Sequence, residues 1–171
     1  MMNLVSLLIQ SMTVFGFEYR DFENGAPGYI AMCDAYSKKL DCLSTLKLIF
    51  EHLITKRELS GCCVNWGLAL AHLIHCFGNK VCIMLTPEPP GRKITVAYQS
   101  DGNLFVADIV EYIKGTASID EISAIPYDEF VAPFGDDVVL LDVDKVEGSF
   151  VDLLFKEDLA SNTTPEEFLQ N

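Results

Sequence analysis

The sequence predicts an α+β protein in which a central buried helix packs on an antiparallel sheet. Two observations favour this class. A nearly continuous apolar stretch runs from Cys63 to Phe77 and stops at Gly78, which is typical of a helix that is buried on all sides and ends at a glycine. Strand-like segments follow it, and Asp101-Gly102 between two of them is typical of a two-residue hairpin turn.

The N-terminal segment is predicted to be an amphipathic helix. Apolar residues recur at helical spacing from Leu4 to Phe15, which indicates a helix over about 3–15. A signal peptide is the other interpretation of an apolar start, but no basic residue precedes Arg20. We therefore expect a docked helix rather than a targeting segment.

A second helix is predicted over about 44–56, after a turn-rich segment at 22–28. Asp41 or Ser44 can cap its N-terminus, because short polar side chains accept hydrogen bonds from the first free N–H groups of a helix. The break at Gly61 then separates this helix from the central one.

The central helix is followed by predicted strands over 80–85, 93–99, 103–108 and 138–143. Pro87, Pro89 and Pro90 are expected to form a loop outside the sheet, because proline cannot donate to a strand ladder. Beyond residue 110 we expect short helical or irregular structure over 112–122, a packed loop over 125–135, a short helix over 150–158, and a frayed end over the final dozen residues.

The 171 residues are expected to form one domain, with a core over about 44–110 and an acidic part over 111–171. The net charge is −13, and residues 101–171 carry 3 basic and 17 acidic side chains. Without a cluster of Lys and Arg, the chain is expected to bind neither nucleic acid nor an anionic membrane. The acidic surface is either a solvated face or a docking surface for a basic partner.

The six cysteines lie mostly inside apolar stretches, which favours free thiols and a cytoplasmic location. Cys76 and Cys82 are expected to behave as small hydrophobic residues at a helix end and in a buried strand. No CxxC pair has partner spacing, and no apolar span reaches 18 residues. We therefore expect no metal, no cofactor and no transmembrane helix.

The order of elements and several residues resemble the transglutaminase-like superfamily, which is related to papain. In that family a Gly-x-Cys begins the central helix, an aromatic residue follows three positions after the Cys, and a Gly ends the helix. A His then begins the first strand of a hairpin, and an Asp ends the second. The matching residues, within about 44–110, are Gly61, Cys63, Trp66, Gly78 and Asp108.

The resemblance implies that Cys63 is a nucleophile, that Asp108 orients a base, and that Trp66 lines the site. A helix N-terminus lowers the pKa of a thiol, which supports this role for Cys63. If the alignment shifts by one residue, Cys62 takes its place. Counting back across the hairpin puts the His position at about Lys93, or at Ile94 or Thr95, and none of these is a histidine. Lys93 either replaces the base, favours the thiolate as a nearby cation, or marks a solvated strand start.

The three histidines offer a poor replacement for the missing base. His72 and His75 lie nine and twelve residues beyond Cys63 on the same predicted helix. They are therefore about 13 and 18 Å away along the helix axis, out of reach of the sulfur. His52, on the preceding helix, is the remaining candidate.

Three functions are compatible with the sequence. The first is a thiol-dependent amide or peptide hydrolase or acyl transferase with an incomplete Cys-His-Asp triad. The second is a catalytically inactive member of the same superfamily that binds a peptide or a protein. The third is an unrelated α+β interaction module in which Cys62 and Cys63 only fill the core.

Overall fold

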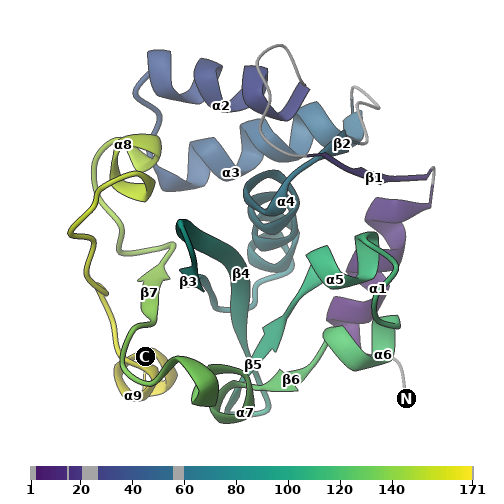
Figure 1. Ribbon diagram of the computed structural model, residues 1–171, viewed down its shortest axis with the longest axis vertical. Helices are drawn as coiled ribbons and strands as arrows, with labels where there is room; N and C mark the ends of the chain where they lie inside the picture. Colours follow the sequence, from purple (N-terminus) through teal and green to yellow (C-terminus); the bar gives the residue numbers. More distant parts are fainter. Residues whose placement is uncertain (1–2, 15, 21–26, 56–59, 171) are drawn as a thin grey trace.

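The computed structural model describes residues 3–14, 16–20, 27–55 and 60–170, and it has an α+β architecture (Figure 1). Its helices are α1 (Leu4–Thr13), α2 (Pro27–Ser37), α3 (Cys42–Phe50), the π-helical turn η1 (Glu51–Thr55), α4 (Cys63–Cys76), α5 (Ile109–Ile113), α6 (Ile119–Ile122), α7 (Tyr127–Val131), the 3-10 turn η2 (Ala132–Phe134), α8 (Phe150–Leu154) and α9 (Pro165–Gln170). Its strands are β1 (Glu18–Tyr19), β2 (Ser60–Gly61), β3 (Val81–Glu88), β4 (Gly91–Ser100), β5 (Asn103–Ala107), β6 (Ile125–Pro126) and β7 (Val139–Asp142).

The main sheet has five antiparallel strands in the order β6-β5-β4-β3-β7, and it carries a core on each face. Successive strand residues point to opposite faces. Ile83 and Val96 accordingly join the large core around α4, whereas Cys82 and Ala97 join a smaller core with Phe168 of α9. Figure 1 shows α4 against the sheet, with α2 and α3 beyond it and with α7 and α9 at the other end of the molecule.

The central helix predicted from Cys63 is confirmed, and it passes very close to β4. A Cβ atom added at Gly67 would lie 3.1 Å from Cγ2 of Ile94, so the glycine permits the close approach. Cys63 is four residues before Gly67 and lies on the same side of the helix. The contact between helix and strand therefore places Cys63 beside Ile94.

The last turn of α4 corrects one expectation. Cys76 is exposed, and Phe77, which follows it, is 59% exposed. Cys82 is buried as expected. The difference arises because Cys82 lies within a central strand, whereas Cys76 lies where the helix emerges from the core.

The proline-rich segment was expected to form a loop outside the sheet, and this is wrong. β3 continues to Glu88, and Pro87 pairs with Arg92 of β4. Pairing of β3 with its other neighbour, β7, ends at Leu85, so Pro87 has no second strand that needs its missing N–H. Pro89 and Pro90 form the turn of the hairpin. The predicted Asp101-Gly102 turn also joins its two strands, with both residues at positive φ.

The helices before the core differ from the prediction mainly in α2, which sequence reasoning missed. Of the predicted turn-rich segment, 22–26 lies outside the described residues and Pro27–Ser37 is helical. Phe15 of the first predicted helix also lies outside them. Asp41 is the cap of α3, because its Oδ1 accepts a hydrogen bond from the Ser44 N–H at 2.9 Å.

The C-terminal part is more regular than predicted. The packed loop expected over 125–135 contains β6, α7 and η2, and the final dozen residues contain α9 instead of a frayed end. Phe168 holds α9 against the sheet, because its side chain is 1% exposed and fills the smaller core. The sequence did not predict this helix, because one aromatic residue among mostly polar ones does not form a helical pattern of apolar residues.

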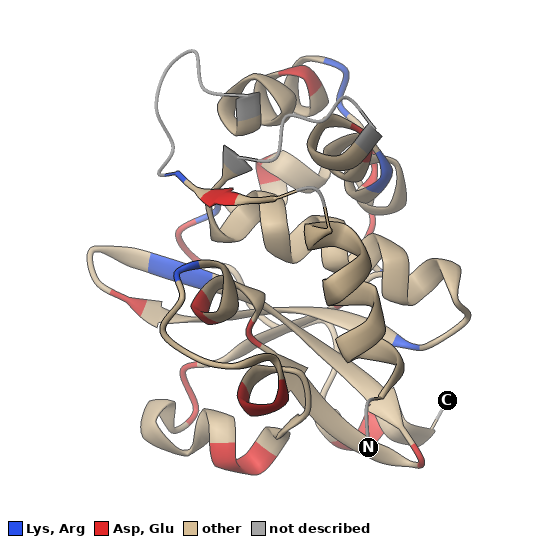
Figure 2. Ribbon diagram, turned by 90° about the vertical axis from the view of Figure 1, so that its right-hand side faces the viewer, with Lys and Arg blue, Asp and Glu red and all other residues tan. Residues whose placement is uncertain are grey.

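Acidic residues occupy the first turns of α5, α6 and α7, which lie along the side shown in Figure 2. Carboxylates in these positions complement the positive end of each helix. None of the described helices combines the length and the hydrophobicity that crossing a bilayer requires.

Candidate functional site at the start of the central helix

Two neighbouring cysteines have different positions at the start of α4. Cys62 is the N-cap and is 6% exposed, and its sulfur accepts hydrogen bonds from the N–H groups of Val64 and Asn65. Cys63 is the first helical residue and is half-buried. The contact with Cys63 and, after it, burial raise the pKa of the Cys62 thiol. Of the two sulfurs, that of Cys63 is therefore the accessible one.

Asn65 holds the start of the helix in place. Its Oδ1 accepts a hydrogen bond from the Cys62 N–H at 3.0 Å, and its Nδ2 donates to the carbonyl oxygen of Gly28 at 3.1 Å. A Cβ atom at either Gly28 or Gly61 would overlap the Asn65 side chain. The asparagine thus ties α4 to α2 and β2 in a tightly filled space.

Trp66 lies in the core beside this helix start. It is fully buried, and its Nε1–H donates to the carbonyl oxygen of Glu18 in β1 at 3.4 Å. β1 pairs with β2 immediately before Cys62. Trp66 therefore supports the backbone around the cysteines and offers no exposed surface to a substrate.

Several groups around Cys63 lower the pKa of its thiol to about 7. The largest effect is the contact with the Cys62 side chain, whose thiol also lies 3.3 Å from Asn65 Oδ1, and burial opposes this effect. The backbone N–H of Ile94 also donates to the Cys63 sulfur, and the ammonium group of Lys93 favours the thiolate, while Glu88 disfavours it. Cys63 therefore carries a substantial thiolate fraction at neutral pH, which is the reactive form of cysteine.

Lys93 forms a partly buried ion pair with two carboxylates. Its Nζ lies 2.7 Å from Oδ2 of Asp108 and 3.3 Å from Oε1 of Glu111. In Figure 2 the basic segment of β4 lies beside the acidic start of α5. Burial alone lowers the pKa of Lys93, but the two carboxylates outweigh it and raise the pKa above its ordinary value. Lys93 is therefore a fixed cation rather than a base near neutral pH.

Asp108 is 5% exposed at the point where β5 leads into α5. Burial raises the pKa of its carboxyl group, and the Lys93 ammonium opposes this shift. Its Oδ1 is buried and has no hydrogen-bond partner within the described part of the chain. The large majority of buried polar atoms in proteins have a hydrogen-bond partner, so this carboxylate oxygen is an exception.

The structure thus brings together Cys63, Lys93 and Asp108 of the predicted site residues. Ile94 and Thr95, the alternatives for the His position, are 4% and 3% exposed, and Ile94 packs against α4. Neither is a titratable residue.

The histidines do not join the site. His75 contacts Asp144 through Nε2 at 2.9 Å at the far end of α4, and the His72 ring lies 5.0 Å from the Phe50 ring. His52 lies on η1. For the residues that the structure covers, no histidine is among the groups that shift the Cys63 pKa.

Sequence reasoning missed Asn65, Glu88 and Glu111. Asn65 follows Cys62 by three residues, which is the spacing of a capping box, and Glu111 follows Asp108 by the same interval, about one helical turn. Both spacings were readable in the sequence. Glu88 carried no such signal, because it reaches Cys63 only through the register of the β3–β4 hairpin.

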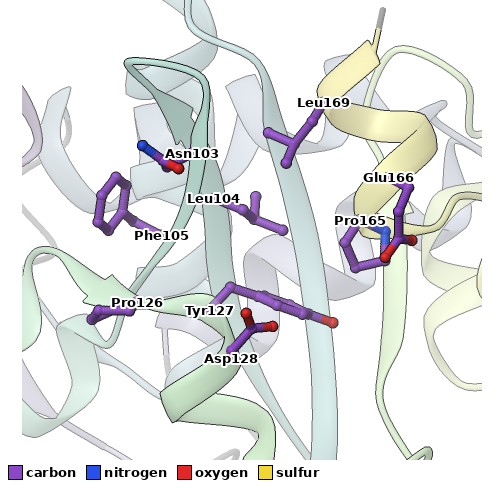
Figure 3. Close-up of a pocket in the computed structure, with 9 residues that line it drawn as sticks. All are labelled: Asn103, Leu104, Phe105, Pro126, Tyr127, Asp128, Pro165, Glu166 and Leu169. Atoms are coloured by element: carbon purple, nitrogen blue, oxygen red, sulfur yellow. The ribbon is translucent and has the colours of Figure 1, made fainter.

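A pocket of about 330 Å³ on the opposite face of the sheet contains none of the predicted site residues (Figure 3). Its walls come from β5, α7 and α9, with the Tyr127 ring lying across it between Leu104 and Pro165. It has no cysteine, histidine or basic side chain in its lining. Over the described ranges, no group of three His, Cys, Asp or Glu side chains is placed to hold a metal ion.

No model of a known protein family matches this sequence, and comparison with curated proteins and with solved structures finds no match either. The function is therefore inferred from the chemistry of Cys63 and the residues around it.

Proposed function

We propose that this protein transfers acyl groups through Cys63, as a thiol-dependent hydrolase or acyl transferase of the transglutaminase-like type in which lysine replaces the histidine. One observation carries the proposal. Lys93, at the position expected for histidine, lies 2.7 Å from Asp108, at the position expected for its partner, and it acts electrostatically on the thiolate at the start of α4. Lys93 and Asp108, from the two chain ends of the β4–β5 hairpin, thus form an ion pair, and Cys63 is the more exposed of the two adjacent cysteines.

The proposed reaction begins with attack of the Cys63 thiolate on the carbonyl carbon of an ester, thioester or amide. An S–C bond forms, the bond from the carbonyl carbon to the leaving group breaks, and the leaving group departs with the bonding electron pair. Water or an amine then attacks the thioester, so that the S–C bond breaks and the thiolate is restored. The attacking water or amine loses its proton to solvent.

Lys93 contributes charge to this reaction. A fixed ammonium group stabilises the thiolate before attack and the negative oxygen that develops during it. Because its carboxylate partners keep Lys93 protonated, it cannot shuttle protons near neutral pH as a histidine does. Thioesters and activated aryl esters, whose leaving groups depart as weakly basic anions, are therefore better donors for this site than amides.

The test is alkylation with iodoacetamide followed by mass spectrometry, and then acylation with p-nitrophenyl acetate. Cys63 should be alkylated fastest of the six cysteines, with an inflection near pH 7. The acetyl group should appear on the peptide that contains Cys63 and be absent from a Cys63→Ala variant. Equal, slow alkylation of all six cysteines would contradict the proposal.

The second candidate, a peptide- or protein-binding protein without turnover, is favoured by the same ion pair. Lys93 contacts two carboxylates, and none of the described residues that act on the Cys63 thiol is a histidine that could serve as its base. Detection of an acyl-enzyme that turns over distinguishes the two candidates, because a binding protein would be alkylated without releasing product repeatedly.

A further inference from the structure

A groove of about 500 Å³ lies between the β3–β4 hairpin and the end of α8, and Val64, the residue after Cys63, is part of its lining. Its apolar lining consists of Val64, Leu85, Pro90, Ile94, Leu154 and Phe155. Arg92, Lys156 and Glu157 also border it, and Arg92 is paired with Asp137 at 3.6 Å. A concave site of this size with a mainly apolar lining is typical of small-molecule binding.

The groove is connected to the nucleophile through two residues. Val64 follows Cys63 in the chain, and Ile94 donates its backbone N–H to the Cys63 sulfur. Both side chains line the groove. Two residues of the groove lining are thus direct neighbours of Cys63, one in the chain and one through a hydrogen bond to its sulfur.

Phe155 extends the apolar surface beyond the groove. This side chain is 61% exposed and also borders a second hollow, of about 330 Å³, that lies between α2 and α8. Met32, Tyr36 and Val151 contribute to that hollow. A contiguous exposed apolar patch often marks a binding site, whereas single scattered apolar residues on a surface usually do not.

We infer that the groove is the acyl-donor pocket of the proposed reaction and that it holds an unbranched apolar acyl chain. This inference rests on the proposed function. A peptide would bring backbone N–H and C=O groups against the apolar lining, where unpaired polar groups are costly. An aliphatic chain has none, and Phe155 borders both hollows, so that the apolar surface continues from the groove to the hollow between α2 and α8.

The experiment compares p-nitrophenyl acetate, butyrate, hexanoate and octanoate as acyl donors for the full chain. The Cys63 thiolate forms the thioester as p-nitrophenolate leaves with the bonding electrons, so the rate follows the released phenolate. The kcat/KM for acylation should rise up to about fourfold per methylene, which corresponds to about 0.8 kcal/mol for each fully buried CH₂. Phe155→Ser should flatten this dependence, whereas Phe77→Ser, a matched exposed phenylalanine away from the groove, should preserve it.

A separate measurement distinguishes a wrong assignment of the groove from a wrong assignment of the acyl-transfer function. Octanoate in excess should slow the alkylation of wild-type Cys63 by iodoacetamide and should do so less in Phe155→Ser. If Cys63 is alkylated preferentially but neither chain length nor octanoate has an effect, the groove assignment is wrong and the nucleophile stands. If octanoate protects Cys63 but no ester acylates it, the acyl-donor role is wrong and the site binds apolar chains only.

Discussion

Cys62 and Cys63 are adjacent in the sequence, yet their sulfurs have opposite properties. The Cys62 sulfur caps α4 and has a raised pKa, whereas the pKa of Cys63 is lowered to about 7. The difference comes from geometry at one helix end. The contact with Cys63 and burial raise the pKa of Cys62 against the opposing effect of the helix N–H groups, whereas the Cys63 sulfur is stabilised as a thiolate by Cys62, by the backbone of β4 and by the charge of Lys93.

Replacement of Lys93 by Met tests the electrostatic part of this description. Loss of the ammonium group removes a charge that favours the Cys63 thiolate, so the pKa of Cys63 should rise from about 7 toward the ordinary value. A rise of one pKa unit reduces the thiolate fraction at pH 7 about fivefold and slows alkylation by the same factor. The measurement is the rate of iodoacetamide labelling between pH 5 and pH 9.

Two further variants make this test specific. Lys38→Met removes a lysine in the turn after α2 whose side chain is 58% exposed, and it should leave the inflection unchanged. Lys93→His restores a base beside Asp108 and should accelerate turnover of the acetyl-enzyme about a hundredfold relative to Lys93→Met, the lower end of what a positioned base contributes. Equal turnover in the two variants would place Lys93 outside the site.

At the scale of elements, the start of α4 is fixed from three directions. Asn65 contacts α2 at Gly28, β2 pairs with β1, and Gly67 packs against β4. Cys63 is the first of the 14 residues of α4. Its orientation therefore depends on these three contacts, which we call the anchor of α4, as well as on the helix itself.

Asn65→Ala should lower the free energy of unfolding by about 1–3 kcal/mol. The side chain is 1% exposed, and its loss leaves the Cys62 N–H and the Gly28 carbonyl oxygen without their partner. Urea denaturation measures the change. Asn103→Ala, at an exposed position, is the control and should change it by less than about 0.5 kcal/mol. Equal stability of the two variants would show that the anchor contributes nothing.

At the scale of the whole molecule, the sheet separates two cores, and the C-terminal helix closes the smaller one. Phe168 is the aromatic residue of that core, together with side chains of β3, β4 and β5. Lys80 reinforces the contact, because its Nζ donates to the Phe168 carbonyl oxygen at 2.6 Å. The last helix is therefore part of the folded structure on which the sheet depends.

Phe168→Ala should destabilise the protein by about 3–5 kcal/mol, because it removes a fully buried ring and leaves a cavity. Thermal and urea unfolding report the loss. Phe77→Ala removes the same ring from a position that is 59% exposed, and its effect should be far smaller. A similar small effect at both positions would mean that α9 does not close the core.

The candidate site was predictable from sequence only in part. The placement of Cys63 at a helix start followed from the apolar stretch after Gly61, and counting across the hairpin about Asp101-Gly102 put the expected His position at about Lys93. The ion pair between Lys93 and Asp108 was not predicted. The contribution of Glu88 could not be foreseen, because the proline-rich segment was expected to lie outside the sheet.

By itself the sequence determined the local elements of this protein: the buried helix from Cys63, the strands of the central hairpin, and the excess of acid after residue 100. These depend on periodicity, turn chemistry and charge, which act over a few residues. Only the tertiary structure decided which sulfur is accessible, that Lys93 binds two carboxylates, and that α9 is ordered. Such features depend on burial and on contacts between residues far apart in the chain, and no local pattern encodes them.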